Sequence, residues 1–393
     1  MTTFLSTAIT RGAIFKRLFV SEKTGSITVL NGRTLLFLAL CLFCSNGLAG
    51  ESPAPSGQEV PKAWIMPTPW VGNGQSLRDM INRGDEWKET RKHIAGVGYW
   101  PYLLNQFHSD EEIREFFAKL REWDLGFGFE VVVVKGPGWI HLEDPKSTLD
   151  AKSAFAMFQK FAPRFQSLGM NRVDWISMES SFIAARTGIP IDQIPDARPI
   201  ELFGTVKNDP DAARQIAYGV EETVSYMAMM RKAYPGTKLG LIEPHPALSL
   251  DELKTAVLGI QKGCAELGIK GLEFFRLDLD WARLERENRP WGDVKKIEDM
   301  FEENGIPFSV IFWASDWPYK KEAGTDTPAT WREGVLHCAK KYREAGGTPA
   351  EIVIADWNWT TAPSVPDSDP DTFTGSSLEY FKAFPPASWR ERP

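Results

Sequence analysis

The sequence predicts a closed (β/α)8 barrel, the fold also called a TIM barrel. Between residues 64 and 361 it repeats eight times a short apolar strand followed by an amphipathic helix. Strands that alternate regularly with helices are parallel, and eight such units are the number that closes into a barrel. Several strands end in an acidic residue, and catalytic residues of such barrels lie where strands end. The pattern therefore predicts both the fold and the end of the barrel that carries the function.

The first four repeats are bounded by recognisable signals. Strands are predicted at 63–70, 93–100, 126–134 and 173–179. The first three are followed by helices near 76–93, from Ser109 onward and over 151–168, and the fourth by a long connection at 183–208 and a long helix ending at Met230. Ser109 with Glu112 three residues later forms a capping box, which is typical of a helix start.

The last four repeats continue the pattern. Strands are predicted at 238–244, 272–281, 307–315 and 350–357, and Ser249 with Glu252 supplies a second capping box. Glycines that suit a left-handed helix cap follow the helical stretches at Gly169, Gly236, Gly268, Gly305 and Gly347. The alternative, an open doubly wound sheet, would need a glycine-rich phosphate-binding turn after an early strand. GPG at 136–138 is too short and carries a proline where amides are needed, so the closed barrel is favoured.

The chain begins with a predicted export signal. Residues 34–44 form an apolar run that Arg33 precedes and that the small residues Gly47 and Ala49 follow, as in a signal-peptidase site. The run is too short for a membrane anchor, so we expect a secreted or periplasmic protein cleaved near Ala49 or Gly50. A lipoprotein anchor at Cys41 or Cys44 is the weaker alternative. The predicted divisions are a signal peptide with an extended N-terminus at 1–49, a linker at 50–62, the barrel at 63–376, and a C-terminal helix and tail at 377–393.

The charge balance excludes some partners. Cleavage would remove five basic residues and one acid (Arg11, Lys16, Arg17, Lys23, Arg33 and Glu22), which leaves 40 basic against 51 acidic residues, a net charge of −11. This balance argues against nucleic acid and anionic membrane surfaces as partners, and it is compatible with a neutral carbohydrate substrate. Cys264 and Cys338 would remain, each inside a predicted helix. Because these helices are two repeats apart, we expect two buried thiols rather than a disulfide.

Three acids are expected to meet over the mouth of the barrel. Side chains alternate between the interior and the helix layer along each strand, and we take the acid-bearing face as inward because an unpaired carboxylate under a helix is costly. Glu179, Glu243 and Asp280 then face one another. Adjacent strands lie ~4.8 Å apart, so Glu179 and Glu243 could approach the ~5–5.5 Å of a retaining glycosidase pair. Glu179 and Asp280 would lie ~9–10 Å apart, within or just beyond the range of an inverting pair.

Glycoside hydrolysis needs one protonated carboxyl and one ionised carboxyl. Our hypothesis makes Glu179 the general acid/base and Glu243 the nucleophile, with Asp278 and Asp280 binding hydroxyls or tuning the acid. Arg276 is a further candidate for substrate binding, although it could instead form a structural ion pair with Asp278. Glu130 is expected to pair with Lys135 or an interior arginine at least as readily as to act in catalysis.

Tryptophans support a sugar-binding mouth, because their faces can carry the apolar surface of pyranose rings. The best placed platforms are Trp100, Trp281, Trp317, Trp357 and Trp359, whereas Trp64 and Trp175 lie early in their strands and are expected to pack in the core. His245 follows Glu243 by two residues and could orient a carboxylate or bind substrate, or simply be a loop histidine.

Four segments resemble a group of secreted bacterial TIM-barrel proteins of the glycoside-hydrolase-like kind: SDEEIREFFAKL (109–120), IEPHP (242–246), FFRLDLDW (274–281) and DPDTFT (369–374). In that group an acid on the fourth strand, a Glu-Pro on the fifth and a spaced acid pair on the sixth recur together. The resemblance covers most of residues 63–376 and implies the fold and a site at the rim. The large retaining glycosidase clan instead has Asn-Glu after strand four and a nucleophilic glutamate after strand seven, where this chain has Met178-Glu179 and Asp316.

The predicted function is hydrolysis of O-glycosidic bonds in a poly- or oligosaccharide, with no required cofactor. One alternative is a divalent-metal sugar isomerase of the xylose-isomerase type, with ligands at Glu179, Glu243, His245, Asp278 and Asp280, which would suit Mg²⁺ or Mn²⁺. The export signal counts against it. The other alternative is a barrel that binds carbohydrate without catalysis.

Overall fold

The computed structural model describes residues 61–70, 72–135, 150–194, 199–357 and 363–390. The predicted signal peptide and nearly all of the predicted linker therefore lie outside the described residues. Within these residues no helix is both long and apolar enough to cross a membrane.

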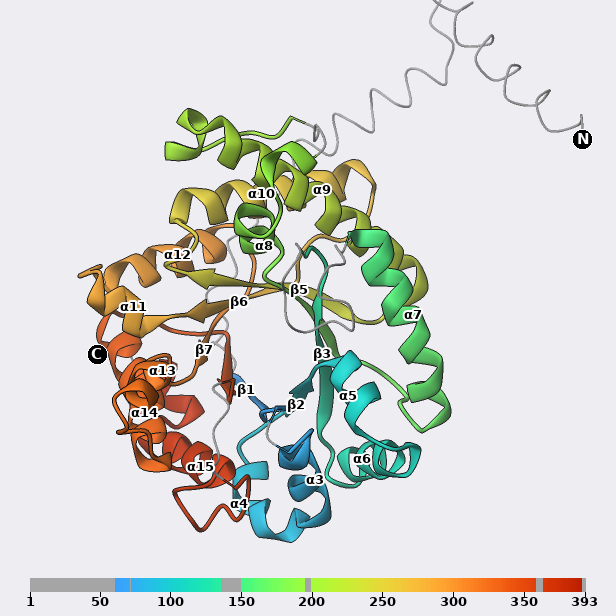
Figure 1. Cartoon of the computed structure of the whole chain (residues 1–393), viewed down its shortest axis with the longest axis vertical. Helices are drawn as coiled ribbons and strands as arrows, with labels where there is room; N and C mark the ends of the chain where they lie inside the picture. The colour runs from blue at the N-terminus through green and yellow to red at the C-terminus, as the bar shows by residue number, and fades with distance from the viewer. Residues whose placement is uncertain (1–60, 71, 136–149, 195–198, 358–362, 391–393) are drawn as a thin grey trace, which may run out of the picture. The chain divides into compact units, whose positions relative to one another are not determined.

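Eight parallel strands form a closed barrel in sequence order, as predicted (Figure 1). The ring closes where β1 pairs with β8, with Trp64 opposite Val353. The strands are β1 (Lys62–Met66), β2 (Gly96–Tyr99), β3 (Gly126–Val132), β4 (Trp175–Glu179), β5 (Lys238–His245), β6 (Phe274–Leu279), β7 (Phe308–Phe312) and β8 (Glu351–Ala355). Because every strand pairs with its sequence neighbours, the open doubly wound sheet is excluded.

Helices follow each strand and surround the ring (Figure 1). They are α3 (Gln75–Asn82), η1 (Gly84–Trp87), α4 (Lys88–Arg91), α5 (Pro101–Phe107), α6 (Asp110–Glu122), α7 (Ala151–Ser167), α8 (Ser181–Thr187), η2 (Ile191–Gln193), η3 (Gly204–Asn208), α9 (Pro210–Ala233), α10 (Leu250–Glu266), α11 (Trp281–Arg286), α12 (Gly292–Glu303), α13 (Trp317–Glu322), α14 (Pro328–Glu344), α15 (Phe373–Ala383) and η4 (Pro386–Arg390). The connection predicted after strand four contains the short helix α8, whose N-terminus bears on the site.

Helix starts follow the predicted signals more closely than helix ends do. Both capping boxes form, at Ser109 with Glu112 and at Ser249 with Glu252. Gly169, Gly268 and Gly305 take left-handed backbone conformations, but Gly236 does not, and near residue 347 it is Gly346 that does. A glycine therefore marks the end of a helix to within one or two residues.

Aromatic rings fill the barrel where glycines leave room for them. Trp64 of β1 and Trp175 of β4 come from strands three apart in the ring, yet their ring centroids lie 5.4 Å apart in an edge-to-face contact. A Cβ atom on Gly128 would collide with the Trp175 indole, and one on Gly240 would collide with the Phe274 ring. These contacts define which side chains point inward, and they confirm that Trp64 and Trp175 belong to the core.

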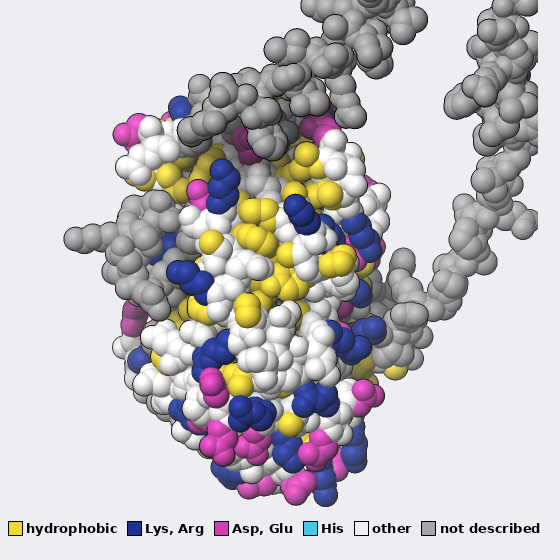
Figure 2. Space-filling model, turned by 90° about the vertical axis from the view of Figure 1, so that its right-hand side faces the viewer, with side chains coloured by type: hydrophobic (Ala, Val, Ile, Leu, Met, Phe, Trp, Pro, Cys, Tyr) yellow, Lys and Arg dark blue, Asp and Glu magenta, His cyan; other side chains and the backbone are white. Residues whose placement is uncertain are grey.

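The outer surface mixes both signs of charge. On the face that Figure 2 shows, apolar side chains gather in the middle, and acidic and basic side chains are interspersed toward one end. Ion pairs three or four residues apart on one helix are common, as between Lys296 and Asp293, and each stabilises its helix by only about 0.2–0.5 kcal/mol. Cys264 and Cys338 are free and buried, as predicted.

Candidate active site

Strand register decides which acids share the interior. Trp175 points inward, and alternation along β4 places Ser177 and Glu179 on the same inner face. Ser177 lies opposite Glu130 of β3, so Glu130 is also inward. On β6, Phe274 points inward, and Asp278 follows it by four residues on the same face. Glu130, Glu179 and Asp278 therefore form one interior carboxyl cluster toward the carboxyl ends of the strands.

The carboxyls of Glu130 and Glu179 are neighbours at the centre of this cluster, and each affects the pKa of the other. Glu130 is completely buried, whereas Glu179 is partly exposed. Burial raises the pKa of Glu130 well above its usual range, and the neighbouring Glu179 raises it further. Burial also raises the pKa of Glu179, but hydrogen bonds from Glu130 and from the Trp100 indole lower it. Of these two carboxyls, the fully buried Glu130 therefore favours its protonated form more strongly.

Asp278 stands apart as a carboxyl that keeps its proton at neutral pH. It is partly exposed, and its Oδ1 atom has no hydrogen-bond partner among the described residues. Burial raises its pKa to about 8, the carboxyls of Glu179 and Asp280 contribute to the rise, and the Trp313 indole partly offsets it. The cluster therefore contains two accessible carboxyls whose pKa values are both raised by burial, with hydrogen bonds opposing the rise at Glu179 and neighbouring carboxyls adding to it at Asp278.

Aromatic side chains surround these two carboxyls. Trp100 follows β2 and contacts Glu179, while the charges of Glu179 and Glu130 add to burial in raising the pKa of the Tyr102 phenol. On the other side, the rings of Trp313 and Trp357 lie 5.7 Å apart and both are partly exposed. Of the remaining predicted platforms, Trp359 and the side chain of Trp317 lie outside the described residues.

The expectation that Glu243 faces the interior beside Glu179 is wrong. Glu179 lies opposite Ile242, so the next residue on β5 points to the helix layer. There the buried Glu243 carboxyl group accepts hydrogen bonds from the backbone N–H groups of Phe182 (2.9 Å) and Ile183 (3.3 Å). Burial raises its pKa to about 8, and these N–H groups partly offset the rise. Glu243 thus fastens the N-terminus of α8.

Asp280 also has a local structural partner. Its Oδ1 atom accepts a hydrogen bond from the Arg283 N–H at 3.0 Å, which caps the N-terminus of α11. The charge of Asp280 still contributes to the raised pKa of Asp278. The three acids expected to meet, Glu179, Glu243 and Asp280, are therefore not gathered on one face, and Asp278 and Glu130 take the places that Glu243 and Asp280 were expected to fill.

Arg276 lies below the cluster and is not placed to bind substrate. Its side chain is fully buried and pairs with Glu351 of β8 at 3.0 Å rather than with Asp278. The guanidinium stacks 3.9 Å from the Trp175 ring and 4.6 Å from the Phe274 ring. Arg276 therefore belongs to the barrel core.

His245 and Trp281 are buried in the helix layer, contrary to the substrate-binding roles expected for them. The His245 ring makes a 3.0 Å hydrogen bond with the Leu248 carbonyl, and burial lowers its pKa, so it is neutral. The Trp281 indole donates to the Trp313 carbonyl at 2.8 Å. Among the described residues no three His, Cys, Asp or Glu side chains are placed to hold one metal ion. The five ligands of the isomerase alternative are thus dispersed.

Two features of the site carried little signal in the sequence. Glu130 stands within a continuous apolar strand. Only the strand register shows that its side chain lies on the same face of the sheet as that of Glu179. Trp313 follows β7, and no glutamate at the end of that strand points to a site there. Gly128 and Gly240 were the available signal for the inward face. Each lies on the face of its strand against which an interior ring packs.

No model of a known protein family matches the sequence, and a comparison with curated protein sequences finds no relative. Solved structures of similar fold include a GH10 endoxylanase from a sugarcane soil metagenome, with 9% identity, 76% of this chain and 86% of that chain covered, and a TM-score of 0.43. Xylanase XynB from Paenibacillus barcinonensis is 10% identical, with 82% of this chain and 92% of that chain covered and a TM-score of 0.41. A D-psicose 3-epimerase is 10% identical, with 84% of this chain and 95% of that chain covered and a TM-score of 0.38. With TM-scores below 0.5, these similarities carry no argument about activity.

The fold and the site together define a (β/α)8 barrel with a carboxyl cluster toward the carboxyl ends of its strands, between two groups of aromatic side chains. Glu179 and Asp278 are the partly exposed carboxyls of this cluster.

Proposed function

We propose that this protein is a glycoside hydrolase that acts on neutral glycans, with Glu179 and Asp278 as the catalytic pair. The observation that carries the proposal is that these two inward, partly exposed carboxyls share one cluster but differ in environment: burial raises the pKa of both, hydrogen bonds oppose the rise at Glu179, and neighbouring carboxyls add to it at Asp278. Two carboxyls in different protonation states are what glycosidic bond cleavage requires.

Asp278 is the general acid in this proposal. At neutral pH it holds a proton that it can donate to the leaving oxygen, because its pKa is raised to about 8. Glu179 is the general base. Two neighbours, the protonated Glu130 carboxyl and the Trp100 indole, stabilise the ionised form of Glu179. An ionised carboxylate can activate a water molecule.

Strand spacing favours inversion of the anomeric configuration. Glu179 and Asp278 lie on strands separated by one strand, which places their backbones ~9–10 Å apart along the sheet. Inverting enzymes hold their carboxyls ~6.5–9.5 Å apart to leave room for water, and retaining enzymes ~5–5.5 Å apart. The spacing supports an inverting reaction more than the retaining pair first expected.

The aromatic neighbours support a sugar substrate. Trp100 and Tyr102 lie on the Glu179 side, and Trp313 and Trp357 lie on the Asp278 side. Trp100 and Tyr102 are buried, so it is the partly exposed ring faces of Trp313 and Trp357 that can carry the apolar surface of a pyranose while the carboxyls act on its oxygens. The export signal predicted at 1–49 extends the proposal to a secreted or periplasmic enzyme.

The test begins with the purified mature protein and a panel of neutral polysaccharides and aryl glycosides, with release of reducing ends as the measurement. Glu179→Gln should lower kcat by about 10²–10⁴-fold, the usual contribution of a general base. Asp278→Asn should do the same for natural glycans but much less for aryl glycosides whose leaving group needs no proton.

Glu243→Gln is the matched control, since it changes a neighbouring buried glutamate on the outer face. Equal loss in all three variants would contradict the assignment. Tight glycan binding with no released reducing ends would instead support the non-catalytic binding barrel.

A further inference from the structure

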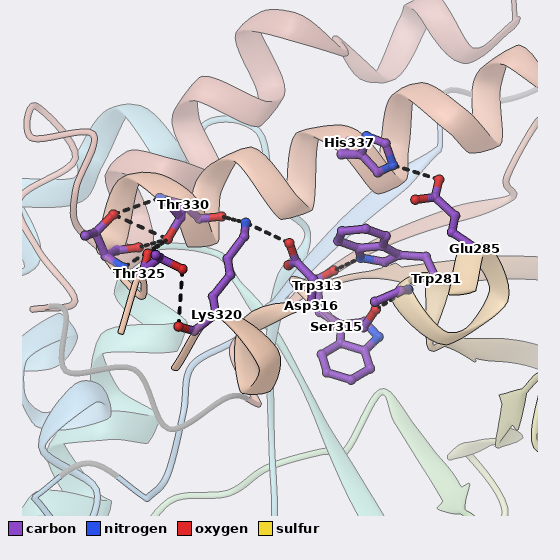
Figure 3. Close-up of polar contacts among 11 residues, drawn as sticks. Trp281, Glu285, Trp313, Ser315, Asp316, Lys320, Thr325, Thr330 and His337 are labelled. Atoms are coloured by element: carbon purple, nitrogen blue, oxygen red, sulfur yellow. Dashed lines mark hydrogen bonds and ion pairs between the residues drawn. The ribbon is translucent and has the colours of Figure 1, made fainter. Parts of the chain in front are cut away.

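The segment that joins β7 to α14 is tied to the neighbouring helix α11 at its start. The Trp281 indole N–H donates to the Trp313 carbonyl at 2.8 Å. Two residues further on, the buried Ser315 hydroxyl accepts a hydrogen bond from the Ala282 N–H at 2.9 Å. Figure 3 shows these contacts beside one another. The backbone that leads from Trp313 into α13 is therefore held in place.

The short helix α13 is fixed on its other side as well. Lys320 Nζ lies 2.7 Å from a carboxylate oxygen of Asp316 and donates to the Thr330 carbonyl of α14 at 2.9 Å. Figure 3 shows the Lys320 side chain reaching between these two partners. A ligand-binding side chain on such a helix is positioned before the ligand arrives, which lowers the entropy cost of binding.

Tyr319 is the exposed aromatic side chain of α13. Among the described residues only two large apolar side chains are exposed, Tyr319 (38%) and Leu267 (50%). The Arg286 guanidinium, at the end of α11, lies 3.9 Å from the centre of the Tyr319 ring and donates to its hydroxyl group. Because the guanidinium covers one face of the ring, the exposure of Tyr319 points to the opposite face as the one open to a ligand.

Tyr319 lies at the end of the barrel that carries Glu179 and Asp278. All strands of the barrel are parallel, and α11 and α13 follow β6 and β7 after short connections, so both helices begin at the carboxyl ends of the strands. Tyr319 follows Trp313 by six residues. A chain spans at most about 3.6 Å per residue, which keeps the two backbone positions within about 20 Å of each other. A glycan of several sugar units covers such a distance.

We propose that the Tyr319 ring is an outer glycan-binding subsite, which holds a neutral sugar residue of a chain that also lies on the rings of Trp313 and Trp357. The nature of the ligand rests on the proposed function. A tyrosine ring offers an apolar face together with a polar edge, which suits the apolar face and the hydroxyl groups of a pyranose. The subsite adds affinity only for chains long enough to reach it, so the substrate is a polysaccharide rather than a disaccharide.

The test measures binding by calorimetry in the full mature protein that carries Glu179→Gln, which should bind a glycan without cleaving it. The probes are soluble arabinoxylan, β-glucan and galactomannan, with the corresponding disaccharides. Tyr319→Ala removes the ring, and Tyr319→Phe keeps a ring against Arg286. Leu267→Ala is the matched control, because Leu267 is the other exposed large side chain and follows α10 at the opposite end of the barrel. Circular dichroism verifies that each variant is folded.

We expect Tyr319→Ala to weaken binding of the best polysaccharide about 3- to 10-fold, the loss of one ring contact, and to leave disaccharide binding unchanged. Tyr319→Phe and Leu267→Ala should bind the polysaccharide as the parent Glu179→Gln protein does. When Glu179 is present, Tyr319→Ala should raise KM for the polysaccharide by a similar factor with little change in kcat.

Unchanged polysaccharide binding in Tyr319→Ala would overturn the subsite, even if the protein proves to be a glycosidase. An equal loss in Leu267→Ala would overturn it too, since that change lies far from the mouth of the barrel. Weaker binding in Tyr319→Ala alone, in a protein that cleaves no glycan, would uphold the subsite and contradict the proposed function.

Discussion

Asp278 should set the upper pH limit of activity. Its pKa is raised to about 8, mainly by burial, and the proposed acid works only while it is protonated, so turnover should decline as the pH rises through about 8. The acidic limit belongs to Glu179, which must be ionised. The measurement is the pH profile of kcat/KM on a glycan substrate. A rate that still increases above pH 9 would be incompatible with Asp278 as the acid.

Glu130 should matter as a hydrogen-bond donor rather than as an acid. Glu130→Gln keeps an N–H that can donate to Glu179, so kcat/KM should stay within a few-fold of wild type. Glu130→Ala removes the donor, and a hydrogen bond to a charged group contributes about 1.5–3 kcal/mol, so we expect a loss of about 10- to 100-fold. Equal activities of the two variants, both folded by circular dichroism, would show that the Glu130 proton is not needed.

At the scale of elements, Glu243 should behave as part of the framework of α8. In Glu243→Ala one buried and one partly buried backbone N–H group lose their acceptor, which should lower the free energy of unfolding by about 1–3 kcal/mol. Glu243→Gln retains an acceptor and should cost less. Denaturant unfolding of both variants is the measurement. Wild-type stability in Glu243→Ala would mean that these hydrogen bonds are not needed to hold α8.

The Glu243 carboxyl should also make the stability of the fold decrease as the pH rises. Its pKa in the folded protein, about 8, lies above its usual value, so its contribution to stability is fully present at low pH and is lost as the pH rises through about 8. Stability should therefore fall between about pH 5 and 8. Glu243→Gln cannot ionise and should flatten this decline, and an unchanged slope in the variant would contradict the assignment.

The sequence predicts elements better than it predicts the faces of strands. Each strand position was found within a few residues, because period, caps and glycines all agree. The inward face of β5 was misjudged because both of its faces are buried, so apolar residues stand at every position of LGLI and alternation disappears. A shift of one residue moves every side chain to the other face. In the structure Ile242, and not Glu243, points into the barrel beside Glu179. The carboxyls that accompany Glu179 in the interior are therefore those of Asp278 and Glu130.

At the scale of the whole molecule, the barrel presents acids and aromatic rings at its site, and Arg276, its buried arginine, is committed to Glu351. A glycan that carries carboxylates would bring further negative charge beside Glu179 and Asp278. We therefore expect neutral polysaccharides to be cleaved or bound in preference to polyuronates, as measured by turnover or by calorimetry at equal polymer concentration. A polyuronate as the best substrate would contradict this view of the site.

The most direct measurement compares Glu179→Gln, Asp278→Asn and Glu243→Gln on one glycan that the wild-type protein cleaves. Glu179 and Asp278 share the inner face of the barrel, and Glu243 lies on the outer face. We expect the first two variants to lose about 10²–10⁴-fold in kcat while remaining folded, and Glu243→Gln to stay close to wild type. Loss of activity in Glu243→Gln with full activity in Asp278→Asn would contradict the assignment of Glu179 and Asp278 as the catalytic pair.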